Sequence, residues 1–585
     1  MVQRAVQIVR VTLLLFCATG CLWCQAQDAG TTSGTDTVYA LHGTVVDGTS
    51  GKPVEKALVV SGDRRLAKLT DSEGRFSFEL SVPAQTAANN ASARAIGVAP
   101  LLSLQGVVLM ASKPGYLQTS GPLFLPIGAE LSAKEVTLKL MPMATISGHV
   151  SASGTEFASN VQVILLRRDV DESGKYEWGE AGIATTNGHG DYHFAVQIPG
   201  EVTVVASGWR GDPVQSQPAN VIHSEYPKTF YGNEKSLGSA VKLQLHYGET
   251  VRADLHMQAA TYFPVTIPVL GLPASGAGND VMSVQIMDEF SLNDDNLSYN
   301  AKRHAVEGSL PAGSYTLLLN RPGDQAVMAV VPVNVEGAVV RSKPVTLGPA
   351  ASVAVQVRTD FTRAAAEPAQ DGAGAGAPPP AELGVVGRER EKEPLVNLTL
   401  QPEGLFTRGY ETPGGYGDTA GFVVKNVPPG RFTVKANPHR GYVASLTSGG
   451  VDLTRDPLVV EAGATVGPIE VILRDDSSTV NGTVTADAEA VAVGFVFLLP
   501  TDANGQVEQT FFGPGGKFSI ENVVPGSYRV IALSAAARMI PYRDAAAMHK
   551  YDGKGTTIKV GPGQTIDVEV PTLEEADAED GQRVE

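Results

Sequence analysis

Residues 70–78 have the sequence TDSEGRFSF, in which a polar turn with a glycine leads into alternating aromatic and polar residues. The same pattern returns as TNGHGDYHF at residues 186–194 and as PGGKFSI at residues 514–520. Alternation with period two is typical of a strand with one buried face, and turn residues about every 8 to 12 positions are typical of β-sandwiches. The pattern therefore predicts a chain built of repeated antiparallel sandwich units.

Other segments recur around this pattern in a fixed order. A strand with a central glycine opens a unit, as in LHGTV at residues 41–45, and an apolar strand such as VQVILL at residues 161–166 follows it. A proline–glycine corner such as VPGSY at residues 524–528 comes after the aromatic strand, because proline presets φ and glycine relieves steric restriction at a sharp turn. A closing hairpin with glycine recurs five times and predicts five units, at Gly128, Gly248, Gly348, Gly463 and Gly563.

These repeats predict the fold class and the domain boundaries. We expect an all-β tandem array of about five antiparallel, Ig-like or prealbumin-like sandwiches. The units are predicted at residues 38–143, 144–260, 261–350, 351–476 and 477–572. A low-complexity insertion is expected at residues 364–394, and a disordered acidic tail at residues 573–585. Short joints between most units predict a semi-rigid rod.

The composition agrees with a folded, turn-rich protein of several domains. The chain has 585 residues, of which 43% are hydrophobic and 18% charged, with 63 glycines and 37 prolines. The formal net charge of −17 argues against a broad surface that neutralises nucleic-acid phosphates. We therefore expect no nucleic-acid partner.

The N-terminus has the pattern of an export signal, predicted at residues 1–26. Arg4 and Arg10 precede a short apolar run at residues 11–17, which is too short to span a bilayer. All three cysteines precede the expected cleavage site, so the mature chain would hold no disulfide. An alternative is a lipobox at residues 18–21, with Cys21 lipidated as an N-terminal anchor. Either route predicts an exported protein that is periplasmic, extracellular or outer-membrane associated, without a transmembrane helix in the mature chain.

The first unit carries a resemblance to a known family. Its GTV at residues 43–45, GKPV at 51–54, ALV at 57–59 and TDSEGRF at 70–76 resemble the carboxypeptidase regulatory-like domain. That family is similar to transthyretin-like and carbohydrate-binding-like sandwiches and contains non-catalytic modules. The resemblance extends to most of the mature chain, and it implies a fold rather than an activity.

One loop matches a calcium-binding pattern. Asp169, Asp171 and Ser173 occupy positions 1, 3 and 5, a glycine follows, and Glu180 stands at position 12. These oxygen ligands suit Ca²⁺, which is the one cofactor that the sequence suggests. An apolar strand precedes the loop, where an EF-hand would have a helix, so a polar hairpin loop without metal is the alternative.

Two histidine patterns suggest metal ligands less specifically. His189 and His193 flank Asp191, but residues four apart in a strand lie about 13 Å from each other, too far to share one ion. His246 and Glu249 have the HxxE spacing of zinc carboxypeptidases, yet they fall on a predicted closing hairpin. We expect neither pair to bind metal.

The second unit also concentrates aromatic residues that could stack on sugar rings. The candidate ligand-binding residues are Tyr176, Trp178, Trp209 and Tyr231. Packing against the core of the sandwich or between units is the alternative, since large aromatic side chains are usually buried.

No catalytic residues are predicted. The sequence lacks the GxSxG, GxxxxGK[ST], HExxH and GxGxxG motifs. We therefore expect a non-enzymatic binding or scaffold protein of the bacterial cell envelope, with an envelope protein or a polysaccharide as its partner. The alternative is a carbohydrate-binding accessory protein of a polysaccharide-degrading or uptake system. A hydrolase with an unrecognised pair of carboxylates is a third possibility.

Overall fold

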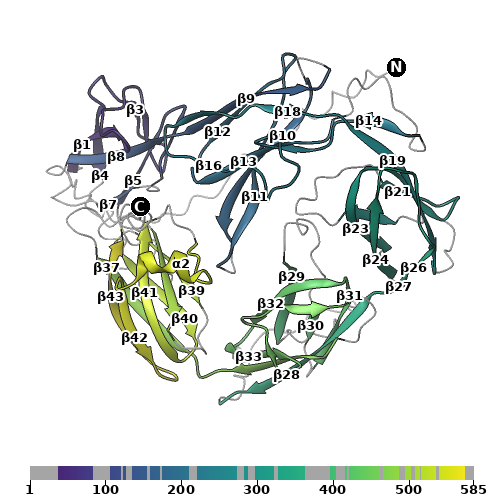
Figure 1. Cartoon of the computed structure of the whole chain (residues 1–585). Coiled ribbons are helices and arrows are strands. Elements are labelled where there is room, and N and C mark those ends of the chain that lie inside the picture. Colours follow the sequence, from purple (N-terminus) through teal and green to yellow (C-terminus); the bar gives the residue numbers. More distant parts are fainter. Residues whose placement is uncertain are drawn as a thin grey trace, which may run out of the picture.

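The computed structural model consists mainly of strands in the part of the chain that it describes. It covers residues 37–82, 106–119, 123–126, 135–154, 158–171, 174–209, 221–272, 282–286, 297–321, 327–362, 395–403, 415–417, 421–461, 466–485, 494–501, 507–513, 515–534 and 539–573. The predicted signal peptide, the insertion and the tail beyond Leu573 lie outside these residues. Within them the strands form five successive sandwiches, which confirms the all-β tandem fold (Figure 1).

The first sandwich packs two four-stranded sheets around a core that includes Leu41, Phe76 and Leu138. One sheet has the order β4 (Arg75–Val82), β1 (Thr37–Asp47), β8 (Glu135–Pro142) and β6 (Tyr116–Leu117). The other has the order β3 (Ala67–Leu69), β2 (Leu58–Ser61), β5 (Gly106–Ser112) and β7 (Leu123–Pro126).

The second sandwich contains a long hairpin formed by β10 and β11. One sheet has the order β11 (Tyr176–Thr185), β10 (Gln162–Val170), β13 (Glu201–Ala206) and β15 (Thr229–Phe230), with β16 (Leu243–Gln244) beside β13. The facing sheet has β12 (Asp191–Val196), β9 (Ala144–Ala152), β17 (Thr250–Arg252) and β18 (Leu255–Met257).

The third sandwich borrows a strand from its neighbour. Its first sheet has the order β14 (His223–Glu225), β19 (Ala260–Leu270), β22 (Ala305–Pro311) and β21 (Leu297–Asn300), with β25 (Val340–Arg341) and β26 (Val345–Thr346) beside β19. Its second has β20 (Ser283–Ile286), β23 (Gly313–Arg321), β24 (Val327–Val335) and β27 (Gly348–Pro349). Because β14 comes from the segment of the second unit, the sequence-based boundary between these units is crossed by a strand pair.

The last two sandwiches complete the array. The fourth has β31 (Gly421–Val427), β28 (Ala351–Asp360), β36 (Ile469–Arg474), β33 (Tyr442–Ser448) and β34 (Val451–Asp452) against β30 (Gly415–Gly417), β29 (Val396–Pro402), β32 (Gly430–Pro438) and β35 (Leu458–Val460). The fifth is one curled sheet of β39 (Glu508–Phe512), β38 (Gly494–Pro500), β41 (Gly526–Ser534), β43 (Thr565–Leu573), β37 (Ser478–Thr485) and β40 (Lys517–Val523), with β42 (Thr556–Val560) beside β41.

The strand directions differ from the purely antiparallel prediction at one recurring place. In the first sandwich β1 pairs in parallel with the closing strand β8, and β28 with β36 and β37 with β43 repeat this arrangement. A chain whose first and last strands are parallel enters a unit at one end and leaves at the other. This geometry allows units to follow one another through short joints.

The opening glycines are explained by aromatic packing. A Cβ on Gly43 would lie 2.6 Å from the ring of Phe76, and one on Gly482 would lie 2.4 Å from the ring of Phe518. In the second unit Gly148 stands in the same relation to Tyr192. The glycine therefore admits the ring of the neighbouring aromatic strand into the core.

Two sandwiches have a third layer that the sequence analysis did not predict. In β10, Val163 and Leu165 enter the inner core while Ile164 and Leu166 enter a second cluster with Phe230 on the outer face. In the fifth unit the outer cluster is covered by residues 540–551, including the short helix α2 (Ala545–Met548) and the 3-10 turn η4 (His549–Tyr551). Continuous apolar runs are typical of strands buried on both faces.

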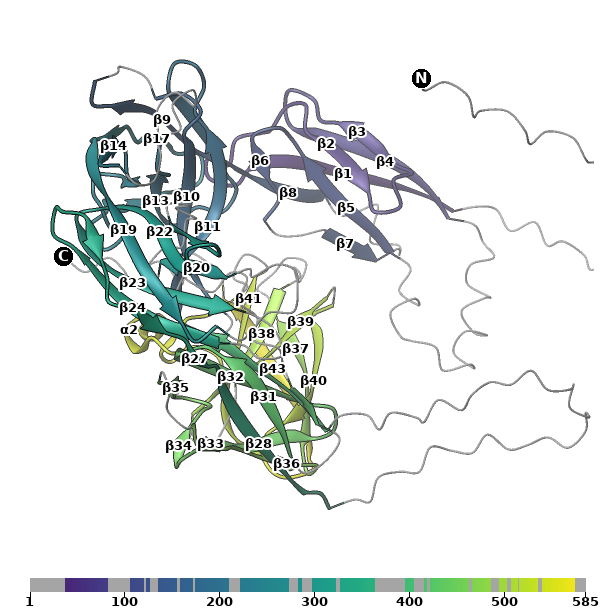
Figure 2. The same cartoon turned by 90° about the vertical axis from the view of Figure 1, so that its right-hand side faces the viewer.

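The array of sandwiches follows a curved path. Figure 1 shows the five sandwiches following a bent path, and the turned view in Figure 2 shows the first unit beside the second and the fourth beside the fifth. Short joints alone do not set this path. Hydrogen bonds also join the second unit to the fourth and fifth, which lie far away in the sequence.

Candidate interaction site at the junction of three sandwiches

The loop predicted to bind calcium lies at the tip of the β10–β11 hairpin. Asp171 stabilises the turn, since its carbonyl accepts from Gly174 and its carboxylate accepts from the amide of Lys175 at 2.8 Å. Asp169 pairs with the guanidinium of Arg167 at 2.7 Å. Glu180 lies opposite Leu166, three residues from Asp169, or about 10 Å along the strand.

The strand register therefore keeps Asp169 and Glu180 apart. Ser173 lies outside the described residues. Among the residues with assigned positions, no group of three or more His, Cys, Asp or Glu side chains is placed to hold a metal ion. The calcium interpretation stays a prediction.

The backbone of this tip packs against the fifth sandwich. A Cβ on Gly174 would lie 2.4 Å from Cδ1 of Tyr542, and Gly174 has a φ of +74°. The amide of Arg543 donates to the carbonyl of Gly174 at 3.2 Å. Glycine thus meets two requirements here, because it accepts the left-handed conformation and leaves room for the tyrosine ring.

A second contact joins the tip to the fourth sandwich. Nζ of Lys175 lies 2.7 Å from Oε1 of Glu403, which follows β29. Nε of Arg431 on β32 lies 3.2 Å from the other carboxylate oxygen of Glu403. One carboxylate therefore bridges two cations from different units, and charge-assisted hydrogen bonds of this kind are stronger than neutral ones.

Arg543 completes the junction. Its guanidinium donates to the carbonyl of Thr454 at 2.8 Å and to that of Arg455 at 3.0 Å, both in the fourth unit. Its backbone amide at the same time contacts the second unit. A single residue of the fifth unit thus binds two other sandwiches.

Burial and charge set the ionisation of the junction. Burial opposes ionisation of Glu403, but hydrogen bonds from Lys175 and Arg431 outweigh it and lower the pKa of Glu403. Burial, reinforced by the neighbouring Asp171, raises the pKa of Glu177. Burial also raises the pKa of Tyr542. The junction therefore favours a charged Glu403 and disfavours a second charge at Glu177.

The four candidate sugar-binding aromatics do not share one exposed face. Trp178 packs against the outer cluster under Nζ of Lys242, 5.0 Å from its ring centroid, and the guanidinium of Arg168 lies 4.4 Å from the ring of Tyr176. Trp209 and Tyr231 pack against the inner core instead. All four side chains are partly buried.

The two histidine patterns have structural partners. Oδ1 of Asp191 accepts from Nδ1 of His149 across the strand pair at 3.1 Å, and this bond lowers the pKa of Asp191. His246 and Glu249 bond to each other at 3.2 Å within a turn. These contacts belong to a strand pair and to a turn, and His193 is exposed on β12.

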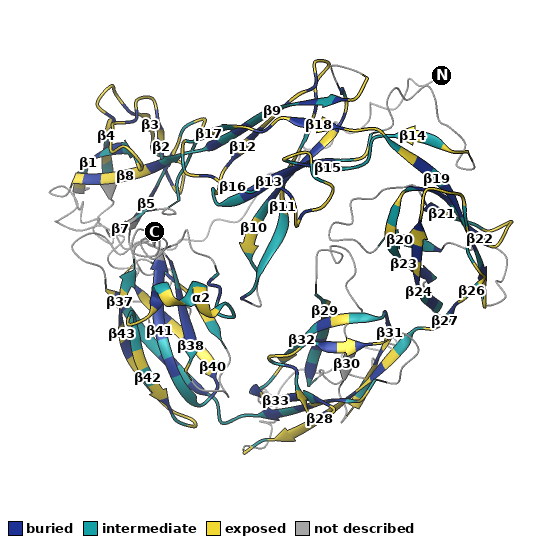
Figure 3. Cartoon of the chain, viewed as in Figure 1, coloured by how far each residue is buried: buried dark blue, intermediate teal, exposed yellow. Residues whose placement is uncertain are grey.

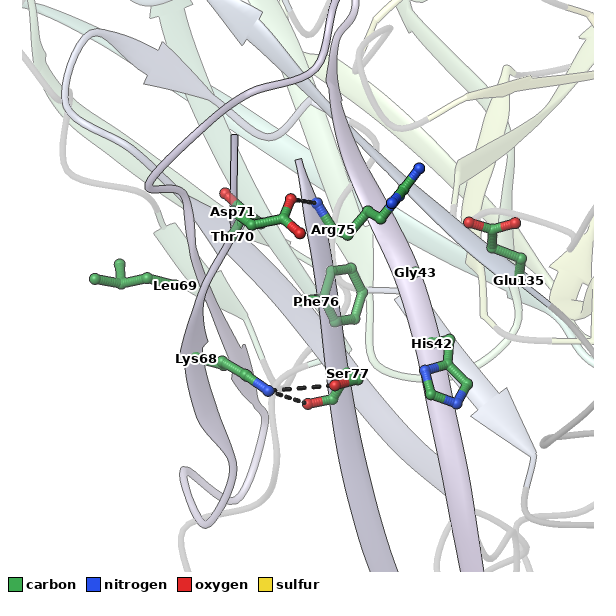
Figure 4. A pocket seen from close by; sticks show the side chains of 10 residues that line it. All are labelled: His42, Gly43, Lys68, Leu69, Thr70, Asp71, Arg75, Phe76, Ser77 and Glu135. Atoms are coloured by element: carbon green, nitrogen blue, oxygen red, sulfur yellow. Dashed lines mark hydrogen bonds between the residues drawn. The ribbon is translucent and has the colours of Figure 1, made fainter. Parts of the chain in front are cut away.

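A shallow pocket of about 360 Å³ lies on the first sandwich. His42, Ser77 and Glu135 stand side by side across β1, β4 and β8, and Lys68 donates to the carbonyl and hydroxyl of Ser77 (Figure 4). Asp71 on its rim accepts from the amide of Arg75 at 2.7 Å. The pocket offers both positive and negative side chains to a polar ligand. Its Lys68 and Asp71, however, already form hydrogen bonds with other residues of the same unit.

The sequence does not predict the junction. It draws attention to the β10–β11 loop through Asp171 and Gly174, but Lys175 and Glu403 are 228 positions apart. Tyr542 and Arg543 belong to no recurring motif of the chain. Only the folded path of the five units brings these residues together.

No family model matches the chain, and no curated protein matches it. Among solved structures, the Bacillus anthracis TIE protein is similar at 12% identity and a TM-score of 0.14, covering 71% of this chain and 69% of that one. The shaft pilin of Lactobacillus rhamnosus GG has 10% identity, a TM-score of 0.18, and coverage of 38% and 97%. The minor pilin of Streptococcus agalactiae has 9% identity and a TM-score of 0.17, covering 41% of this chain and 99% of that one. Similarities of this size carry no argument about function.

The described residues contain no helix long and apolar enough to cross a membrane. Cys21, the predicted lipidation site, is outside them.

Proposed function

We propose that this chain is an exported, non-enzymatic scaffold protein of the bacterial cell envelope. The export pattern of residues 1–26 supports the location, and the tandem sandwiches support the scaffold role. We include in this proposal the carboxypeptidase regulatory-like character of the units, which rests on the motifs of residues 43–76.

The observation that carries the scaffold role is that the sandwiches are tied to one another. β14 of the second unit pairs with β19 of the third, and Arg543 of the fifth contacts both the second and the fourth. Independent binding modules on flexible linkers need no such contacts. A protein that presents several surfaces in one defined arrangement does need them.

Carbohydrate binding is the second candidate, supported by two observations. Trp178 keeps part of its surface exposed beside Tyr176, and the first unit has a polar pocket. In this function the chain would serve a polysaccharide-degrading or uptake system, with Ca²⁺ at the β10–β11 loop as an optional ligand.

A glycan array separates the two candidates. Residues 27–585 are applied with calcium and with chelator, beside variants with Trp178→Ala and Trp209→Ala that remain folded. A scaffold gives no selective glycan binding under either condition. Selective binding that both substitutions abolish would replace the scaffold proposal with the carbohydrate one, and loss in chelator alone would assign calcium to the loop.

Export is tested separately. Residues 1–40 are fused to a reporter enzyme that folds only after leaving the cytoplasm, with Cys21→Ala as the companion variant. The proposal expects reporter activity in both, and a lipid-dependent membrane fraction that only Cys21→Ala abolishes would identify an anchored form. An inactive reporter would contradict the envelope location.

A further inference from the structure

The tip of the β10–β11 hairpin fits a defined receiving surface. We call this surface the socket and define it by residues from two other units: Glu403, Thr454 and Arg455 of the fourth, and Tyr542 and Arg543 of the fifth. Figure 1 shows β11 projecting from the second sandwich toward α2 and the fourth sandwich.

The fit depends on shape at one point and on charge at another. The ring of Tyr542 occupies the space that any side chain at position 174 would need. Beside it, the ammonium group of Lys175 lies 2.7 Å from Glu403, which is only 21% exposed. The two contacts come from adjacent residues, so they form or break together.

Apart from the ring of Tyr542 against Gly174, the contacts named between these units are polar, and the buried residues lie inside each sandwich (Figure 3). Every hydrophobic cluster of the described residues lies within a single sandwich, and none crosses from the second unit to the fourth or fifth. Interfaces that lack a shared apolar core resemble transient associations, and relative motion of the domains is then expected. The tip and the socket can therefore separate without unfolding either unit.

We propose that the hairpin tip and the socket form a reversible ionic clasp, which closes the array by binding the second sandwich to the fourth and fifth. Closed, the clasp sets the curved path of the chain and covers the socket. Open, it leaves an extended array with the socket free. This inference concerns shape and does not depend on the envelope function.

Small-angle X-ray scattering of residues 27–585 tests the steric part. Gly174→Leu places a side chain against Tyr542, so we expect a larger radius of gyration and maximum dimension than in the wild type. The matched control is Gly154→Leu in the same sandwich, where φ is also positive at +88° but nothing lies within 4 Å. Equal scattering from both variants and the wild type would overturn the clasp.

The ionic part is tested without altering the turn. Lys175→Glu places a carboxylate beside Glu403, and we expect it to expand the molecule as Gly174→Leu does. Lys235→Glu, on an exposed position of the second unit, should not. The wild type should also expand in about 1 M NaCl, where the Debye length falls to about 3 Å. A radius of gyration unchanged by Lys175→Glu and by salt would contradict an ionic clasp.

Light scattering in the same experiments distinguishes closure within one chain from exchange between chains. The clasp predicts a monomeric mass in every sample. A doubled mass for the compact wild type, with a monomeric Gly174→Leu variant, would show that the socket takes the hairpin of a second copy and would overturn the intramolecular proposal.

Discussion

At the residue scale, the glycine of the opening strand in the first, second and fifth units is required by its aromatic neighbour. The recurrence of glycine and aromatic residues is visible in the sequence, so the fold class could be predicted from it. Their contact is not visible, because Gly43 and Phe76 lie on strands whose pairing depends on the whole sheet. The periodicity predicts which face is buried, but it does not say which position the ring fills.

Gly43→Ala should destabilise the first sandwich. The added methyl group would meet the carbonyl of Val136 at 2.4 Å and the ring of Phe76 at 2.6 Å. Overpacking of this kind costs about 1–3 kcal/mol, which lowers the melting temperature of a domain of this size by at least about 5 °C. Differential scanning calorimetry measures the shift. Gly188→Ala, where nothing lies within 4 Å, is the control, and equal melting curves for the two variants would contradict the packing argument.

Glu508 on β39 should make the fifth sandwich sensitive to pH. Burial raises the pKa of Glu508 to about 7, so the folded protein resists an ionisation that the unfolded chain completes near its ordinary value of 4.5. Stability is therefore lost as the pH rises from about 4.5 to about 7. The partly exposed side chain limits the loss to about 2 kcal/mol.

Glu508→Gln removes this dependence. We expect the variant to melt at a higher temperature than the wild type at pH 8 and at the same temperature at pH 4.5, measured by calorimetry. Glu521→Gln, on an exposed position of the adjacent β40, serves as the control. A variant that is less stable than the wild type at pH 8 would show that the carboxylate is stabilising.

At the element scale, the corner before a long strand is fixed by a tyrosine in two units. The hydroxyl of Tyr528 donates to the carbonyl of Val524 at 2.6 Å, and that of Tyr315 donates to Pro311 at 2.9 Å. This four-residue return resembles the tyrosine corner of immunoglobulin-type sandwiches. The proline and glycine of the sequence predict the corner, but they do not reveal the hydrogen bond.

Tyr528→Phe should cost the fifth sandwich about 1–2 kcal/mol, because Tyr528 is fully buried and the carbonyl of Val524 would lose its donor without access to water. Tyr315→Phe should cost less, since Tyr315 is partly exposed and water can replace the hydroxyl. Calorimetry of both variants measures the difference. A larger loss for Tyr315→Phe would contradict the role of burial.

The sequence predicts single strands better than it predicts how they pair. Alternation identifies strands such as β4, and the apolar run of β10 is visible as well. The parallel pairing of β1 with β8 and the transfer of β14 to the third unit are not predicted, because neither changes the local pattern of either strand. Such pairings depend on where the chain returns after a long excursion.

At the scale of the whole molecule, the joint between the second and third sandwiches is a strand pair instead of a linker. His223 of β14 lies opposite Tyr262 of β19, and their rings stack with centroids 5.7 Å apart. Nε2 of His223 lies 3.0 Å from Oε1 of Glu225, and Nδ1 lies 2.8 Å from the carbonyl oxygen of Val221. The imidazole is 4% exposed; its hydrogen bonds hold the β14 segment itself, and its stacking on Tyr262 is a side-chain contact with the third unit.

This joint should make the two sandwiches unfold together. His223→Ala removes the stacking and both hydrogen bonds, so β14 should detach and one calorimetric transition should become two. Amide hydrogens of residues 260–262 should exchange faster in the variant, because these residues lose the neighbouring strand β14. His193→Ala changes an exposed histidine on β12 of the same unit and should leave both readouts unchanged. Two results would show that the joint does not couple the units: separate transitions already in the wild type, or amide exchange in β19 that is as slow in His223→Ala as in the native chain. The curved path of the array must then rest on the contacts of Gly174 and Lys175 with the socket.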